Sequence, residues 1–181
     1  MTGALILAAG SSSRLGQPKQ FVVREGQTLV RRIARVALEA GCAPVVIVEG
    51  AVRLGEALEG LPVEIAHCPR WQAGQGASLK HGLAALGDRC DAVVVLLVDQ
   101  LRVDAGDVRA LLAAPGLVAA AAYDGVLGVP ARFSGPALAV LRGLPDAPGA
   151  RAWLARHRDR VSAVPMPHAA VDLDVPGDLS R

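Results

Sequence analysis

At 181 residues the chain is long enough for one domain with a substantial core, and we expect a single domain over residues 1–181. Hydrophobic residues make up 52% of the chain but aromatic ones only 3%, which suits a helix-covered sheet and excludes a base-stacking surface for nucleic acid. The net charge of +2 also argues against a duplex-binding protein, so no nucleic-acid partner is expected.

The chain opens with a predicted buried strand over residues 4–9, followed by the loop GSSSRLGQPKQ at residues 10–20. Glycine and serine let backbone N–H groups approach an anion closely, and Arg14 and Lys19 supply positive charge. The alternative interpretation is a strand-to-helix turn with two solvated cations, but such a turn needs neither three serines nor two glycines. The loop therefore predicts a polyphosphate site.

Two common phosphate-loop patterns do not fit this loop. GxxxxGK[ST] requires glycine at the position of Leu15 and lysine at the position of Gly16, and GxGxxG requires glycine in place of Ser12. P-loop hydrolases and Rossmann dehydrogenases are therefore disfavoured.

Strands and helices alternate along the rest of the chain. A helix capped by Thr28 is predicted over residues 28–40, with Arg31, Arg32 and Arg35 on a solvated face. Further strands are predicted over 45–48, 63–66, 92–98 and 117–123, and further helices over 55–58, 77–86, 107–113 and 150–158. The alternation predicts the α/β class: a Rossmann-like three-layer sandwich, with a mainly parallel sheet and helices on both faces.

Acidic side chains stand at two places that suit a metal ion. Asp99 follows seven apolar residues, and ligands of an open parallel sheet bind beyond the carboxyl ends of its strands. Asp172 and Asp174 project to the same side of an extended chain, so they can close on one ion with Asp99. Mg²⁺ prefers oxygen ligands and is often held by one or two carboxylates plus phosphates, so it is the expected cofactor. For Asp99, the alternative is a helix cap or a surface turn.

The segment WQAGQGASL at residues 71–79 is a second glycine-spaced loop. It can cradle a planar base through backbone groups and the Ser78 hydroxyl, or it can be an ordinary helix N-terminus. Farther along the chain, Arg132 or Arg151 can hold a phosphate, although either is as easily a solvated cation. Trp153 and His168 fit structural roles better than catalytic ones.

The segment LAAGSSSRLGQPKQ resembles the signature LAAGxSxRxGxPKx of nucleotidyltransferases that join an NTP to a phosphorylated acceptor. Within these it is similar to the MobA-like NTP transferase family, and closest to the molybdenum cofactor cytidylyltransferase branch. WQAGQGASL is similar to the family segment WxxGxGxSL, and the ending DLDVPGDL resembles DxDTPxDL with Val175 in place of threonine. Leu101 stands where proline is common, and Phe21-Val22 replaces a leucine pair. The resemblance covers residues 4–179.

The resemblance implies that an acceptor phosphate oxygen attacks the α-phosphorus of a bound NTP and that pyrophosphate leaves. It implies CTP as the nucleotide and molybdopterin as the acceptor, with Arg14, Lys19 and Asp99 as catalytic residues and Asp99, Asp172 and Asp174 on Mg²⁺. Around the nucleotide it places Leu7, Ala8, Ala9, Gly10, Ser11, Ser12, Ser13, Arg14, Lys19, Gly74, Gln75, Gly76, Ser78 and Asp99. Around the acceptor it places Gln100 with Arg132 or Arg151.

Two other functions stay open at this point. One is a different transferase, which moves GMP to molybdopterin or CMP to a sugar or polyol phosphate. The other is a nucleotide-binding factor without turnover that matures a molybdoenzyme, and such an enzyme or its maturation factor would then be a partner.

The start of the chain and its cysteines bear on the cellular setting. The apolar start lacks a basic leader and is too short to span a membrane, so no membrane association is expected. Cys42, Cys68 and Cys90 are odd in number and not closely spaced, which argues against a disulfide framework or a zinc site. We therefore expect a cytoplasmic protein, with Cys42 and Cys90 buried.

Overall fold

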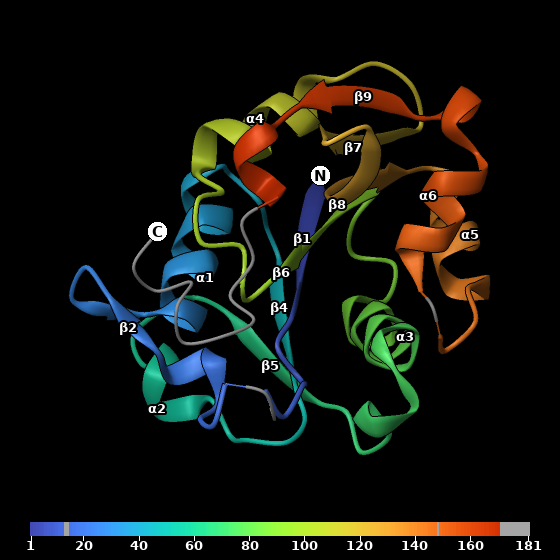
Figure 1. Ribbon diagram of the computed structural model, residues 1–181. Coiled ribbons are helices and arrows are strands. Elements are labelled where there is room, and N and C mark those ends of the chain that lie inside the picture. Colours follow the sequence, from blue (N-terminus) through green and yellow to red (C-terminus); the bar gives the residue numbers. More distant parts are fainter. Residues whose placement is uncertain (13–14, 148, 171–181) are drawn as a thin grey trace.

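The computed structural model describes residues 1–12, 15–147 and 149–170. Its main sheet has seven strands in the order β5-β4-β1-β6-β8-β7-β9 (Figure 1). The strands are β1 (Thr2–Leu7), β4 (Val45–Glu49), β5 (Glu64–His67), β6 (Ala92–Leu97), β7 (Val118–Tyr123), β8 (Val126–Ser134) and β9 (Ser162–Pro165). β8 runs antiparallel to both of its neighbours and the other pairs are parallel, so the predicted mainly parallel sheet is confirmed. β2 (Val23–Arg24) and β3 (Gln27–Thr28) form a small separate hairpin.

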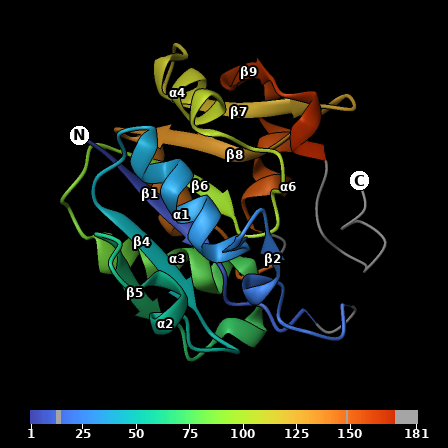
Figure 2. The ribbon, with the colours of Figure 1, turned by 90° about the vertical axis from the view of Figure 1, so that its left-hand side faces the viewer.

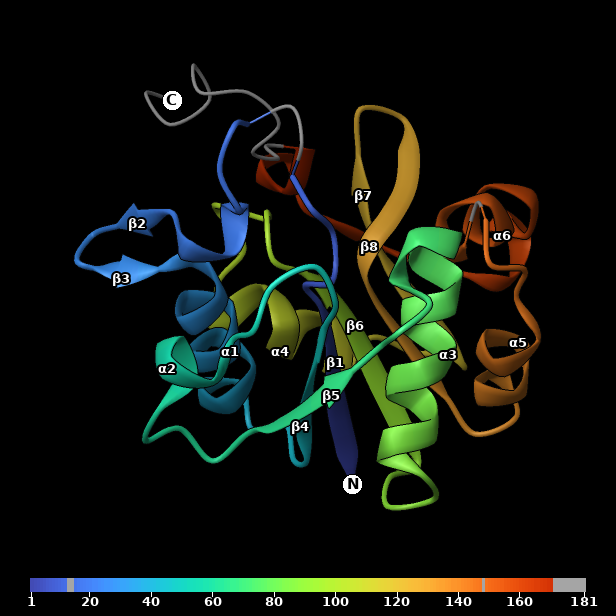
Figure 3. The same ribbon diagram turned by 90° about the horizontal axis from the view of Figure 1, so that it is seen from below.

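Helices cover both faces of the sheet (Figure 3). One face carries α1 (Leu29–Glu39), α2 (Gly55–Leu58) and α4 (Ala105–Ala113), and the other carries α3 (Gln75–Leu86), α5 (Ala137–Gly143) and α6 (Ala150–Arg156). Short 3-10 turns complete the chain: η1 (Lys19–Phe21), η2 (Trp71–Ala73), η3 (Arg158–Arg160) and η4 (Pro167–Ala170). Along β1, Ala4 and Ile6 belong to one core and Leu5 and Leu7 to the other, as the alternation of a strand requires. The three-layer sandwich is confirmed.

Helix α1 begins and ends as its sequence predicts. The hydroxyl of Thr28 accepts a hydrogen bond of 3.4 Å from the backbone N–H of Arg31, which caps the N-terminus. Leu29 and Ile33 are fully buried where the helix packs on β1 and β4 (Figure 2). Gly41 follows the helix with a φ of +87°, a conformation that a residue with a side chain rarely adopts.

Three elements in the C-terminal part of the chain were not predicted: β8, α5 and β9. β7 and β8 form a hairpin whose turn is Asp124-Gly125, with φ of +47° and +75° at the two residues. Two consecutive positive φ values are typical of the tight turn that joins antiparallel strands. The reversal inserts one antiparallel strand into the otherwise parallel sheet.

The burial predicted for Cys42 and Cys90 is confirmed, and Cys68 is buried as well. Cys42, Cys68 and Cys90 are buried and free, and burial raises the pKa of the Cys42 thiol to about 11. Among the residues that the structure describes, no helix combines the length and apolar character needed to cross a membrane.

Candidate active site

A cleft of about 290 Å³ opens beyond the carboxyl ends of β1 and β6, which pair in parallel up to Leu7 and Leu97. It is lined by Leu7, Ala8, Ala9, Gly10, Ser11, Ser12, Lys19, Gln20, Trp71, Gln72, Gly74, Gln75, Ser78, Leu97, Val98 and Asp99. The edge beyond the strand ends is where an open α/β sheet binds its ligands. The structure therefore gathers all the described residues predicted for the nucleotide around this cleft, except Gly76.

In the loop after β1, the N–H of Ala8 donates to the Val48 carbonyl at 3.0 Å, and beyond it the loop is held through its carbonyl groups. The carbonyls of Ala8 and Gly10 accept hydrogen bonds of 2.7 and 2.8 Å from Nε2 of Gln20, whose side chain is fully buried. The carbonyls of residues 9 and 12 are also hydrogen-bonded. By contrast, the N–H groups of residues 9–12 donate to no acceptor within the described part of the chain. N–H groups of this kind are available to bind an anion.

Lys19 and Asp99, which lie 80 residues apart in the sequence, form an ion pair in the cleft. The distance from Lys19 Nζ to Asp99 Oδ2 is 2.6 Å, and the two side chains are 17% and 16% exposed. The second carboxylate oxygen, Oδ1, is buried and has no hydrogen-bond partner among the described residues. A buried carboxylate oxygen without a partner is costly, and a cation would satisfy it.

The N-terminal end of α3 forms the opposite wall, through Gly74, Gln75 and Ser78. A Cβ atom at Gly74 would lie 2.5 Å from the carbonyl oxygen of Asp146, and one at Gly76 would overlap that of Pro145. The Gly76 N–H donates to the Asp146 carbonyl at 2.8 Å. These two glycines are therefore required by packing against the 145–146 turn. Gly76 was predicted to contact the nucleotide, but it lines neither this cleft nor the second pocket described below.

Asp146 also holds this wall through its side chain. Its carboxylate binds Lys80 Nζ at 2.5 Å and Arg70 Nη2 at 3.2 Å. The hydrogen bond from Lys80 is the main reason that the pKa of Asp146 is lowered. The turn thus connects α3 to the residues before η2.

The variant Gly76→Ala is expected to lower the free energy of unfolding by about 1–3 kcal/mol, because the new methyl group cannot fit against the Pro145 carbonyl. Gly55→Ala is the control, since a Cβ there meets no described atom within 4 Å and Gly55 starts α2. Urea denaturation measures both. Equal stability of Gly76→Ala and the wild type would contradict the packing explanation.

A second pocket, of about 160 Å³, adjoins the first. It is lined by Leu7, Gln75, Leu79, Val95, Leu97, Asp99, Gln100, Tyr123, Val129, Ala150 and Arg151. Leu7, Gln75, Leu97 and Asp99 belong to both pockets, so Asp99 lies where the two meet. Of the two arginines predicted for the acceptor, Arg151 is the one that lines this pocket.

Arg132 has a structural role, which corrects its prediction as an acceptor ligand. It lies on β8 and is 6% exposed, and this burial lowers the pKa of its guanidinium. Nε donates to the Leu111 carbonyl at 3.0 Å, and Nη2 donates to the carbonyls of Ala114 and Gly116 at 3.0 and 2.9 Å. Arg132 therefore holds the C-terminal end of α4 and lines neither pocket.

The side chain of Gln100 is also engaged within the chain. Its Oε1 accepts a hydrogen bond of 3.0 Å from the N–H of Leu97, and its Nε2 donates to the Val129 carbonyl at 2.8 Å. Gln100 is 2% exposed, so it is part of the wall of the second pocket and joins β6 to β8. Its contact with an acceptor stays a prediction.

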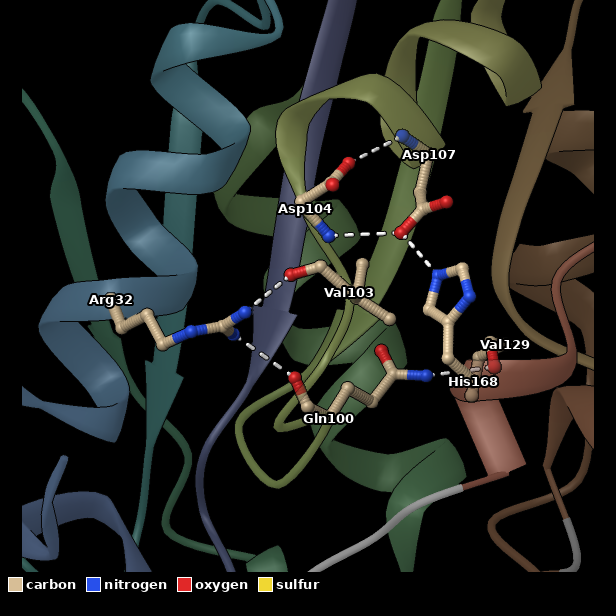
Figure 4. A network of polar contacts seen from close by, with 7 residues as sticks. All are labelled: Arg32, Gln100, Val103, Asp104, Asp107, Val129 and His168. Atoms are coloured by element: carbon tan, nitrogen blue, oxygen red, sulfur yellow. Dashed lines mark hydrogen bonds and ion pairs between the residues drawn. The ribbon is translucent and has the colours of Figure 1, made fainter. Parts of the chain in front are cut away.

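Arg32 was predicted on a solvated face, and this is wrong. Its guanidinium donates to the carbonyls of Gln100 and Val103, at 3.1 and 2.7 Å (Figure 4). In the same figure His168 Nε2 lies 2.7 Å from Asp107 Oδ2, in agreement with its predicted structural role. A sequence pattern does not distinguish Arg32 from its neighbours Arg31 and Arg35.

Four predicted site residues lie outside the described part of the chain: Ser13, Arg14, Asp172 and Asp174. Within the described residues, no group of three or more His, Cys, Asp or Glu side chains is placed to hold a metal ion.

The sequence is similar to several known proteins. It is 30% identical over 164 residues to the purine catabolism protein PucB of Bacillus subtilis (strain 168), a match that covers 83% of this chain and 78% of PucB. It is 36% identical over 108 residues to the bifunctional enzyme IspD/IspF of Caulobacter vibrioides (strain NA1000 / CB15N), which covers 54% of this chain and 26% of that enzyme.

Solved structures share the fold. Rv0371c from Mycobacterium tuberculosis H37Rv has a TM-score of 0.80 and 27% identity, with 100% of this chain and 96% of that chain covered. A nucleotidyl transferase from Methanothermobacter thermautotroptrophicus has a TM-score of 0.86 and 24% identity, with 100% and 95% covered. Residues 4–161 match the model of the MobA-like NTP transferase domain. The chain therefore belongs to the MobA-like NTP transferase family and is a nucleotidyltransferase.

Proposed function

We propose that the protein transfers CMP from CTP to a phosphorylated small-molecule acceptor, molybdopterin, and releases pyrophosphate. One observation carries the proposal: Asp99 lies on the wall that the two pockets share. A nucleotide in the larger pocket and an acceptor in the smaller one would meet at its carboxylate. This arrangement suits a direct transfer between two bound substrates, which needs positioning and charge neutralisation but no covalent nucleophile.

The loop after β1 supports a triphosphate position. The N–H groups of residues 9–12 would bind the β- and γ-phosphates, with Ser13 and Arg14 added on the strength of the sequence resemblance. A Cβ at Gly10 meets no described atom within 4 Å, so chain packing does not require glycine at that position. The absence of a Cβ atom at Gly10 leaves room for a phosphate close to the backbone. Lys19 would stabilise the charge that develops on the α-phosphate.

The residues present fit a Mg²⁺ ion. Oδ1 of Asp99, which has no partner among the described residues, is the hard oxygen ligand that Mg²⁺ prefers, and substrate phosphates normally supply further ligands. Asp172 and Asp174 would complete the site on the sequence resemblance alone. When bound, the ion would neutralise phosphate charge during transfer. A structure of the neighbour Rv0371c in complex with manganese, at 24% identity, gives this expectation a precedent in the same fold.

The lining of the second pocket supports an acceptor that presents a flat ring face and a phosphate. Six of its residues are aliphatic: Leu7, Leu79, Val95, Leu97, Val129 and Ala150. A pterin ring suits such walls, and Arg151 is placed to bind a terminal phosphate.

Cytidylyl transfer to a polyol phosphate is the second candidate. The similarity to the Caulobacter IspD/IspF enzyme favours it, and the same fold occurs in a 2-C-methyl-D-erythritol 4-phosphate cytidylyltransferase from Thermus thermophilus with a TM-score of 0.69. A role without turnover is set aside, because the family assignment is to a transferase.

CTP is expected to bind at least tenfold more tightly than GTP in the presence of Mg²⁺. Each buried donor or acceptor left unmatched by the wrong base costs about 1–3 kcal/mol. Ser78 lines the larger pocket and is only 4% exposed, so its hydroxyl is placed to contribute to this discrimination. Ser78→Ala should narrow the gap between the two nucleotides, as measured by titration calorimetry.

Ser162→Ala is the matched control, because that hydroxyl donates to the Pro115 carbonyl at 2.7 Å and lines neither pocket. It should leave the preference for CTP unchanged. GTP binding as tight as that of CTP in the wild type would move the protein to guanylyl transfer.

A further inference from the structure

The loop that carries Asp99, residues 98–104, joins β6 to α4 and is held by hydrogen bonds at both ends. At its start, the Gln100 side chain binds the Leu97 N–H and the Val129 carbonyl. At its end, Asp104 and Asp107 each accept a hydrogen bond from the other's backbone N–H, a capping box that starts α4. Figure 4 shows Arg32 reaching this loop from α1, on the opposite side from His168.

Arg32 binds two carbonyls of the Asp99 loop at once. One belongs to Gln100, the residue directly after Asp99, and the other to Val103. The planar guanidinium is suited to bridge two acceptors, whereas a lysine ammonium on a flexible stem is not preorganised to do so. The side chain is half-buried, and desolvation is the main cause that lowers the pKa of Arg32. Desolvating a guanidinium is unfavourable, so these two hydrogen bonds are needed to compensate for it.

We propose that Arg32 is a positioning residue for Asp99: by bridging the Gln100 and Val103 carbonyls it fixes the backbone on which the cation-binding carboxylate stands. Arg32 lines neither pocket, so it acts through the loop and not on a substrate. The proposal rests on the proposed function, in which the Asp99 carboxylate binds the divalent ion.

Arg31 supplies a control from the same helix. Its Nη1 donates to the carbonyls of Ala57 and Glu59 at 3.1 and 2.9 Å, so it also joins α1 to a neighbouring segment through two backbone acceptors. Neither Ala57 nor Glu59 lines the two pockets. Loss of either arginine removes the same kind of structural contact, but only Arg32 contacts the loop that carries Asp99.

The test compares Arg32→Met and Arg31→Met, which keep much of the apolar stem and remove the donors. Binding of Mn²⁺ to the full chain in the presence of CTP is measured by electron paramagnetic resonance of the free ion, with thermal unfolding recorded for each variant. We expect Arg32→Met to weaken Mn²⁺ binding about tenfold, the lower end of the effect of groups that orient metal ligands. Arg31→Met should stay within about twofold of the wild type while losing a similar amount of thermal stability.

Asp99→Asn separates failure of this proposal from failure of the proposed function. If the wild type binds no Mn²⁺ with CTP, or if Asp99→Asn binds it as tightly as the wild type, the metal site itself is overturned and the role of Arg32 with it. If Asp99→Asn loses Mn²⁺ while Arg32→Met binds like Arg31→Met, only the role of Arg32 is overturned. Should Arg32→Met fail to fold, Arg32→Lys decides, with weakening of about threefold or more expected and binding equal to wild type contradicting the proposal.

Discussion

Lys19→Ala is expected to lower turnover about 100- to 1000-fold, the loss typical of removing one electrostatic contact to a transition state. Lys19 lines the larger pocket and lies 2.6 Å from Asp99, which places its ammonium group beside the expected position of the α-phosphate. Steady-state kinetics of pyrophosphate release measure the effect, with CTP saturating.

The chain offers one matched control, because Lys80 is its other lysine. Lys80→Ala loses the contact to Asp146 but lines neither pocket, so turnover should stay within about fivefold of the wild type. Lys19→Ala should also bind Mn²⁺ with CTP no more weakly than the wild type, since it removes a cation that competes for the Asp99 carboxylate. Turnover of folded Lys19→Ala equal to that of the wild type would contradict its catalytic role.

Asp99→Asn is expected to raise the Mg²⁺ concentration for half-maximal activity more than about tenfold and to lower turnover at any Mg²⁺ concentration. The substitution removes the negative charge from the wall that both pockets share, and with it the ion pair to Lys19. Titration of Mg²⁺ against activity measures the shift.

Asp91→Asn is the control for this titration. Asp91 precedes the same strand, β6, and its carboxylate pairs with the N-terminal ammonium group at 2.6 Å, where it is 90% exposed. Its Mg²⁺ curve should coincide with that of the wild type. Coincident curves for Asp99→Asn and the wild type would show that Asp99 does not bind the ion.

Much of the fold could be predicted because local signals and the global fold agree. The apolar runs of β1, β4 and β6 are buried on both faces, so they appear in the sequence as continuous hydrophobic stretches. Thr28 caps α1 as its residue type suggests. Because ligands of an open parallel sheet bind beyond the carboxyl ends of its strands, the loop after β1 and Asp99 were both predicted to lie at the ligand site. The structure shows that they line one cleft.

The failures concern residues whose role is decided by distant partners. Arg32 is one of three arginines close together on α1, and nothing in the sequence sets it apart from Arg31 and Arg35. Its hydrogen-bond acceptors are carbonyls of the Asp99 loop, which only the fold brings next to it. In the sequence, Gly76 looks like part of a ligand-binding loop. In the structure, glycine is needed there because the turn at residues 145–146 packs against it, and the nearer of these residues is 69 positions away in the chain. Arg132 is buried because α4 ends beside β8. The spacing of apolar residues in the sequence does not show that these two elements pack together.

One missed element did carry a local signal. Asp124-Gly125 stands between two apolar runs, and this dipeptide is a strong indicator of a tight hairpin. The sequence prediction treats Arg132 as an acceptor ligand and misses the strand β8 that carries it. A hairpin prediction there would have placed Val129 beside the end of β6, where Gln100 binds its carbonyl.

Acceptor-dependent release of pyrophosphate from CTP by the wild type is the direct test of cytidylyl transfer to molybdopterin. Phosphorus nuclear magnetic resonance follows CTP, pyrophosphate and product together, with molybdopterin and 2-C-methyl-D-erythritol 4-phosphate supplied separately and GTP as the competing nucleotide. We predict that, with Mg²⁺, pyrophosphate and a CMP–molybdopterin product appear in equal amounts, and that neither GTP nor the polyol phosphate supports comparable release. Release that requires GTP or the polyol phosphate, or no release with molybdopterin and CTP, would contradict cytidylyl transfer to molybdopterin.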